Sequence, residues 1–187
     1  MRGNPITELL LDAPIIAAVK SEEGLRQALA SNSAVIFLLY GTVCNISEIT
    51  GQVKANGKQA FVHLDLVDGL SSRDVAVDFI RRNTDADGII STRQNIIRHA
   101  HDCGLTTVQR FFVHDSLALE NVVRQPSDAD LLDILPGTIP KTLRQISQKV
   151  RRPLIASGLL SDKEDILNAL GAGAIAVSAT TPALWFL

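Results

Sequence analysis

Small residues, several of them with hydroxyl groups, directly follow the last two apolar runs of the sequence, residues 154–156 and 174–177. Small side chains let backbone N–H groups approach the oxygens of a phosphate, and a helix that starts nearby adds its positive end. Thr181 followed by Pro182 is typical of such a helix start. The alternative interpretation is that the small residues only close tight turns. We expect phosphate binding, by Ser157, Gly158, Ser178, Ala179 and Thr180.

Two carboxylates, Asp65 and Asp68, follow an earlier apolar run, residues 60–64. Carboxylates in this position could act as acid and base, hydrogen-bond a polyol or hold a divalent cation. In the structural alternative, Asp68 forms a turn with Gly69 and Asp65 pairs with a buried cation. The sequence leaves ligand contact and structural pairing equally open.

Arg110 interrupts the apolar run of residues 108–113. A guanidinium in such a run must be paired, because burying a lone charge is very costly. Asp133, inside the apolar run of residues 131–135, is the expected partner. We favour a structural ion pair between Arg110 and Asp133, and contact between Arg110 and an anionic ligand is the alternative.

The other residues with catalytic or metal-binding chemistry form no motif. His99 and His101 lie in a helical pattern with polar neighbours, so we expect both to be solvated. The four histidines and two cysteines show no metal-ligand spacing, and neither a nucleophile elbow nor a Walker loop occurs. Lys20 follows the first apolar run, and we expect a loop cation rather than a Schiff-base lysine. The sequence therefore predicts no catalytic residue, no metal ion and no cofactor.

Basic residues cluster modestly in the C-terminal part of the chain. A solvated helix face is the favoured interpretation, and an RNA-binding patch is the alternative. A net charge of -2 and a pI near 6.1 exclude a strongly basic nucleic-acid binder, and 4% aromatic residues leave few side chains for base stacking. Any RNA contact would therefore be local, at Lys141, Arg144, Lys149, Arg151 and Arg152.

Eight short apolar runs alternate with amphipathic, helix-like segments. Most of the runs are continuously apolar, which is typical of strands covered on both faces. Eight such units without a linker predict a compact (β/α)8 TIM-type barrel of parallel strands, and an open doubly wound sheet is the alternative. The expected strands are residues 15–19, 35–39, 60–64, 88–90, 108–113, 131–135, 154–156 and 174–177.

Length and composition fit one barrel domain that spans residues 1–187. A chain of 187 residues with 46% hydrophobic residues can bury a core and is too apolar to be disordered. It is short for a barrel, which more often has around 250 residues, so the loops must be short. We expect residues 5–11 to form a short helix that caps the bottom of the barrel.

We find no signature of export or membrane insertion. The N-terminal segment lacks a signal-peptide profile, and no apolar stretch approaches the roughly 20 residues that span a bilayer. Cys44 and Cys103 are too few for a disulfide scaffold, so we expect free thiols. The expectation is a cytoplasmic protein without a membrane partner.

Five blocks of sequence resemble the glycerol uptake operon antiterminator regulatory proteins. The resemblance runs from near Pro14 to the end of the chain, and the order of the blocks is specific although each block alone is not. The blocks are residues 87–92 (DGIIST), 109–116 (QRFFVHDS), 134–141 (ILPGTIPK), 155–159 (IASGL) and the final pair Leu184 and Trp185.

This resemblance implies a barrel without known catalytic activity that binds glycerol-3-phosphate. Such a protein then acts on leader messenger RNA to prevent premature transcription termination. Carried onto this sequence, phosphate binding falls to Ser157, Gly158, Ser178 and Thr180, in agreement with the residues chosen above. The glycerol hydroxyls would meet Asp65, Asp68 or Ser91.

Two positions depart from the usual pattern of this family. A pair of glycines usually stands where this chain has Ser157 and Gly158, which could alter the backbone approach to phosphate. Glutamate usually stands where this chain has Asp133, which shortens the reach to Arg110.

We therefore expect a glycerol-3-phosphate-responsive transcription antiterminator that binds the leader mRNA of glycerol uptake and metabolism genes. Its expected partners are a small phosphorylated ligand and that mRNA, and a homo-oligomer is left open. The rival is a phosphate-binding barrel enzyme of the aldolase, isomerase or epimerase class that acts on a small sugar phosphate, because barrels host many functions. A barrel that acts only through protein contacts is a third alternative.

Overall fold

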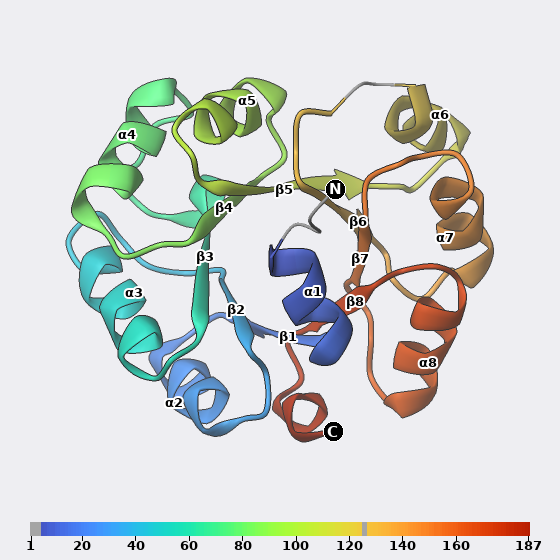
Figure 1. Ribbon diagram of the computed structural model, residues 1–187, viewed down its shortest axis with the longest axis horizontal. Helices are drawn as coiled ribbons and strands as arrows, with labels where there is room; N and C mark the ends of the chain where they lie inside the picture. Colours follow the sequence, from blue (N-terminus) through green and yellow to red (C-terminus); the bar gives the residue numbers. More distant parts are fainter. Residues whose placement is uncertain (1–4, 125–126) are drawn as a thin grey trace.

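The computed structural model describes residues 5–124 and 127–187, which form a closed barrel of parallel strands (Figure 1). Each strand pairs with the next one along the chain, and β8 closes the ring by pairing with β1. The predicted TIM-type barrel is thus confirmed, and the doubly wound alternative is wrong because its sheet would have two open edges. The strands are β1 (Ile15–Val19), β2 (Val35–Leu38), β3 (Gln59–His63), β4 (Gly88–Ser91), β5 (Thr106–Phe112), β6 (Leu131–Leu135), β7 (Leu154–Ser157) and β8 (Ala176–Ala179).

Helices surround the barrel and cover the outer faces of its strands (Figure 1). They are amphipathic: in α2, Leu25 and Ala28 are buried, whereas Glu22 and Glu23 are exposed. No helix in the described part of the chain is long and apolar enough to cross a membrane. The α-helices are α1 (Pro5–Asp12), α2 (Glu22–Ala30), α3 (Ile46–Ala55), α4 (Asp74–Asn83), α5 (Gln94–Asp102), α6 (Ser116–Arg124), α7 (Pro140–Ser147) and α8 (Lys163–Gly171).

The two ends of the described chain cover different parts of the barrel. α1 lies across the centre of the ring in Figure 1, and its Ile6 and Leu10 pack against the barrel interior. After β8, a short 3-10 helix, η2 (Pro182–Phe186), stands where another crossover helix would be. Trp185 in η2 is buried and donates from Nε1 to the Ala179 carbonyl at 2.8 Å. This bond anchors the C-terminal segment to the end of β8.

Inward-facing side chains change from apolar to polar along the barrel axis. Side chains alternate across a strand, so every second residue points into the barrel. Toward the amino ends of the strands these residues are apolar and form one cluster with α1, as Phe37 and Val108 illustrate. Toward the carboxyl ends, those of β3 and of β5 to β8 are polar but still buried, namely His63, Arg110, Asp133, Ser157 and Ser178.

The last two strands end later in the chain than the sequence predicts. β7 includes Ser157, and β8 runs to Ala179, so that Ser157 and Ser178 are register partners within the sheet. The predicted strands ended with their apolar residues. Parallel pairing continues through the serines because its hydrogen bonds come from the backbone.

Candidate functional site

A cavity of about 700 Å³, which we call the mouth cavity, opens at the carboxyl ends of the strands. Barrel proteins place their ligand sites at this end, where the loops that follow the strands meet. The mouth cavity is lined by Arg110 and by all five small residues that are expected to bind phosphate: Ser157, Gly158, Ser178, Ala179 and Thr180. The structure thus brings together residues that are distant in sequence.

The turn after β7 has an unusual backbone at the rim of the mouth cavity. Gly158 and Leu159 both have positive φ angles, of 78° and 62°. Glycine adopts this conformation freely, whereas leucine rarely does. The Leu159 side chain is also 76% exposed, although it is apolar. Strained backbone of this kind is concentrated at functional sites, which supports a binding role for the turn.

Arg110, Asp133 and Ser157 form a buried polar network next to the mouth cavity. Arg110 and Asp133 are register partners on β5 and β6, and Nε of the arginine donates to Oδ2 of the aspartate at 2.7 Å. The Ser157 hydroxyl donates to the other carboxylate oxygen. Asp133 has no exposed surface, so these donors must replace the water that its charge has lost.

Arg110 can serve both of the roles that the sequence leaves open. Within the described residues, only its Nε–H is engaged in a hydrogen bond. A guanidinium has further N–H groups on its terminal nitrogens, and the Arg110 side chain lines the mouth cavity. Structural pairing with Asp133 and contact with an anion are therefore compatible.

Lys20 also lines the mouth cavity, although the sequence indicates only a loop cation. Its place directly after β1 is the signal in the sequence that points to the site. Among the described residues that line the cavity, Lys20 and Arg110 are cationic and none is acidic. The cavity therefore favours an anionic ligand electrostatically.

The residues expected to contact a polyol lie outside this lining: Asp65, Asp68 and Ser91. The Asp65 carboxylate accepts a hydrogen bond from the Ser91 hydroxyl at 3.0 Å and lies 3.5 Å from Nε of Arg93. Asp68 instead donates its backbone N–H to the Gly41 carbonyl at 2.9 Å. These contacts favour the structural interpretation of Asp65, and polyol contact by the three residues stays a prediction.

His63 is a buried titratable group in the polar layer of the barrel, with 3% of its surface exposed. Burial lowers its pKa to about 4, because the charged imidazolium loses its hydration, and the nearby Arg110 charge acts in the same direction. Asp65, whose Oδ2 lies 4.0 Å from Nδ1, has the opposite effect on this pKa. The His63 ring is therefore neutral at pH 7.

We expect His63 to make the fold less stable in mild acid. The ordinary histidine pKa is 6.5, so the unfolded chain takes up a proton as the pH falls below 6.5, whereas the folded chain resists protonation until about pH 4. Stability from this group is complete above pH 6.5 and falls by about 3 kcal/mol between these values. Urea unfolding of His63→Leu from pH 7 to 4 should show a free energy of unfolding that depends less on pH than that of wild type.

His101→Leu, at an exposed histidine of α5, is the control and should leave this pH dependence unchanged. An unchanged pH dependence in His63→Leu would contradict the assignment.

The five basic residues of the candidate RNA patch are exposed and lie outside the mouth cavity. Lys141 and Arg144 lie in α7, whereas the other three lie between α7 and β7. Because that segment leads into the amino end of β7, Arg151 and Arg152 lie at the end of the barrel opposite the mouth. None of the five forms an ion pair with another described residue. Their charges are therefore free to meet an anionic partner.

Three side chains with metal-ligating atoms lie close together on the outer helices, although the sequence shows no metal-ligand spacing for them. Asp78 of α4 and His99 and Cys103 of α5 place their ligand atoms within 4.8 Å of one another. His99 is also not simply solvated, because its Nε2 lies 2.9 Å from Oδ1 of Asp78. The four-residue spacing of His99 and Cys103 is visible in the sequence. The contribution of Asp78 is not, because it depends on how α4 packs against α5.

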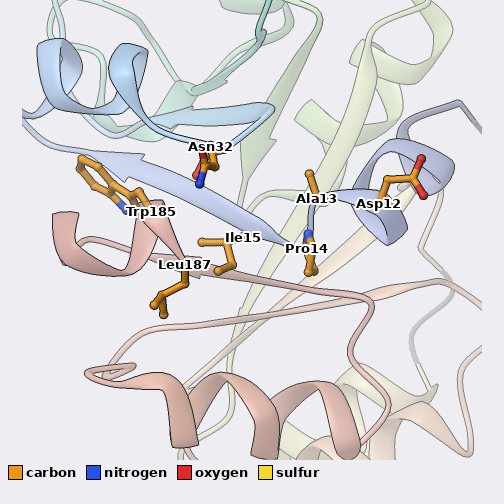
Figure 2. A pocket seen from close by; sticks show the side chains of 8 residues that line it. Asp12, Ala13, Pro14, Ile15, Asn32, Trp185 and Leu187 are labelled. Atoms are coloured by element: carbon orange, nitrogen blue, oxygen red, sulfur yellow. The ribbon is translucent and has the colours of Figure 1, made fainter.

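A second cavity, of about 170 Å³, lies where the C-terminal segment meets the start of β1. Figure 2 shows Ile15 of β1 between Asn32 and Leu187. The Asn32 backbone N–H donates to the Trp185 carbonyl at 3.2 Å, which joins the segment to the loop before β2. None of the predicted site residues lines this cavity, and we interpret it as a packing seam.

The sequence model of the glycerol-3-phosphate responsive antiterminators matches residues 15–185. The chain belongs to this family. The resemblance seen in the five sequence blocks is thus confirmed, and in this antiterminator-family protein the mouth cavity is the candidate ligand site.

Relatives of this antiterminator-family protein cover nearly its whole length. The uncharacterized protein YgcP of Escherichia coli (strain K12) is 42% identical over 185 residues, which are 98% of this chain and 97% of YgcP. The glycerol uptake operon antiterminator regulatory protein of Listeria monocytogenes has a TM-score of 0.87 and 34% identity, over 91% of this chain and 94% of its own. A glycerol uptake operon antiterminator-related protein of Thermotoga maritima has a TM-score of 0.82 and 31% identity, over 92% of this chain and 98% of its own.

Proposed function

We propose that this antiterminator-family protein binds glycerol-3-phosphate in the mouth cavity and, in response, binds the leader mRNA of glycerol uptake and metabolism genes. Family membership supports the class of regulator. The observation that carries the ligand assignment is the charge of the cavity, which is lined by Lys20 and Arg110 and, within the described residues, by no carboxylate. A small phosphorylated ligand complements these charges.

The phosphate would lie against the ends of β7 and β8, where Ser157 and Ser178 are register partners. The Ser157 hydroxyl is engaged by Asp133, so Ser157 would contribute through its backbone. Ser178 lines the cavity, and its hydroxyl forms no hydrogen bond with a described residue, so it is available to the ligand. Gly158 lets the chain approach the oxygens closely. Ala179 and Thr180 are the other two residues that would contact the phosphate.

Glycerol hydroxyls would need a second group of contacts. Asp65, Asp68 and Ser91 lie outside the cavity lining. They would reach the glycerol only in a bound conformation that draws their loops toward the mouth. A ligand shifts such an equilibrium only if it binds one state more tightly than the other. The proposal therefore requires that glycerol-3-phosphate favour the RNA-binding state.

We assign no catalytic role to this protein. The enzyme alternative would use Asp65 or Asp68 as its base. Asp65 is engaged by Ser91 and Arg93 outside the mouth cavity, and Asp68 does not line that cavity either. An antiterminator acts on nascent transcripts, so the proposal places the protein in the cytoplasm.

We expect glycerol-3-phosphate, but not glycerol, to tighten binding to the leader transcript of the glycerol uptake operon. Fluorescence anisotropy with labelled transcript, repeated over a range of salt concentrations, measures this. Each phosphate contact on single-stranded RNA contributes a slope of roughly -0.7 in log K against log salt. Arg151→Ala/Arg152→Ala should weaken binding and reduce the magnitude of the slope by about 1.4.

A matched pair of arginines provides the control for this experiment. Arg81 and Arg82 are also adjacent and exposed, but they lie on α4, far around the ring from α7 (Figure 1). Arg81→Ala/Arg82→Ala should leave RNA binding unchanged. Equal binding with and without glycerol-3-phosphate would contradict the sensing mechanism. Equal losses in both double variants would place the RNA surface elsewhere.

A further inference from the structure

A cluster of three potential metal ligands lies on the outer layer of the barrel, apart from the mouth cavity. The Nε2 atom of His99 lies 2.9 Å from Oδ1 of Asp78 and 3.7 Å from Sγ of Cys103. Sγ of Cys103 lies 3.9 Å from the same Asp78 oxygen. None of the three residues lines the mouth cavity, and the proposed function does not use them.

These separations are close to those of a tetrahedral metal site. Zinc binds nitrogen, sulfur and oxygen at about 2.0, 2.3 and 2.0 Å, so its tetrahedral ligands lie about 3.3 to 3.6 Å from one another. The three observed separations of 2.9, 3.7 and 3.9 Å differ from this range by less than the movement that a side-chain rotation provides. An ion could therefore enter with small side-chain adjustments.

The fold holds the three ligands from two elements. His99 and Cys103 are four residues apart at the C-terminal end of α5, so they lie on one face of that helix. α4 packs against α5 and brings Asp78 to this face. The His99 and Asp78 side chains are 30% and 38% exposed, so the site is open to solvent on one side. A water molecule could complete the coordination, as in zinc sites with three protein ligands.

The chemistry of the donors selects the class of metal. One imidazole, one thiolate and one carboxylate suit a borderline ion such as Zn²⁺ or Co²⁺, whereas Mg²⁺ and Ca²⁺ prefer all-oxygen ligands. The carboxylate and the thiolate together neutralise a divalent charge. A nearby positive charge acts against metal binding, because Nε of Arg81 donates to the Cys103 carbonyl at 3.4 Å. Binding must release the thiol proton to solvent, so affinity should rise with pH.

We propose that Asp78, His99 and Cys103 form a binding site for a divalent transition-metal ion of the zinc type, which links α4 to α5. The alternative is a hydrogen-bonded His99–Asp78 pair with a neighbouring thiol and no affinity for metal.

Cobalt titration of reduced, tag-free protein after chelator treatment tests the proposal. Co²⁺ bound to a thiolate gives a charge-transfer absorption in the near ultraviolet, and tetrahedral Co²⁺ gives intense visible bands. We expect both signals to saturate at one Co²⁺ per chain and to disappear when Zn²⁺ is added. Absence of the charge-transfer band would overturn the proposal.

Variants identify the ligands. Supporting residues around metal sites typically contribute about 10- to 100-fold to affinity, so loss of a direct ligand should cost more than about 100-fold. Cys103→Ser should abolish the charge-transfer band, and Asp78→Asn and His99→Ala should weaken Co²⁺ binding by that factor. Cys44→Ser, at the other and exposed cysteine, is the control and should bind as wild type does. Circular dichroism verifies that each variant is folded. A band that survives Cys103→Ser or vanishes in Cys44→Ser would contradict the assignment.

Discussion

Asp133→Ala is expected to lower the free energy of unfolding by about 3–5 kcal/mol, because it leaves a buried guanidinium without its counterion. Arg110 is buried, and its Nε–H donates to the fully buried Asp133 carboxylate at 2.7 Å. The Ser157 hydroxyl would lose its acceptor as well. Urea unfolding at pH 7 measures the change. It would be a large share of the roughly 5–15 kcal/mol by which domains are stable.

Two further variants show whether burial of the ion pair is the cause of the large loss of stability expected for Asp133→Ala. Asp128→Ala breaks an exposed pair with Arg98, whose atoms lie 3.1 Å apart, and should cost at most about 1 kcal/mol. Arg110→Met/Asp133→Leu removes both buried charges and should be much less harmful than Asp133→Ala. A cost for Asp133→Ala as small as that for Asp128→Ala would show that the pair is not desolvated in solution.

Gly158→Asp is expected to abolish the stabilisation of the protein by glycerol-3-phosphate. In wild type, ligand at 100 times its dissociation constant should add about 2.7 kcal/mol to stability and raise the melting temperature. The substitution places a carboxylate at the turn that is proposed to hold the phosphate. It also forces a φ of 78° on a residue with a side chain, whose Cβ would meet Cδ2 of Leu135 at 3.2 Å. Thermal melting with glycerol-3-phosphate, glycerol and inorganic phosphate in parallel measures the effect.

Matched substitutions separate charge from backbone strain. Gly158→Asn has nearly the same shape and the same φ but no charge, so it should retain part of the ligand effect. Gly57→Asp creates a similar strain at a φ of 72°, where its Cβ meets nothing within 4 Å, and it lies far from the mouth cavity. It should lower the melting temperature but keep the full ligand effect. A Gly158→Asp protein that is stabilised as strongly as wild type would show that the phosphate binds elsewhere.

The sequence alone determines that this chain forms a parallel sheet covered by helices, whereas its closure into a barrel is decided by the pairing of β8 with β1. Continuous apolar runs indicate strands buried on both faces, and the amphipathic segments between them indicate helices that cover the outside. The periodicity of apolar residues is a local property, so it can be recognised in the sequence without any knowledge of tertiary contacts. It is less informative at strand ends, where Ser157 and Ser178 continue the backbone pairing without being apolar.

The sequence also indicates one half of the candidate site. Small residues after the last two strands indicate that backbone N–H groups can approach a phosphate there. An arginine inside an apolar run indicates an ion pair, because a buried charge requires a partner. Asp133 could be chosen for Arg110 on that ground, and the two are register partners at the mouth.

Only the tertiary structure decides which side chains meet across elements. It places Lys20 in the mouth cavity, turns Asp65 toward Ser91 instead, and brings Asp78 to His99 and Cys103. These outcomes depend on strand register and on how helices pack, which are set by the whole core at once, so the spacing within one segment does not show which residue of another segment it meets.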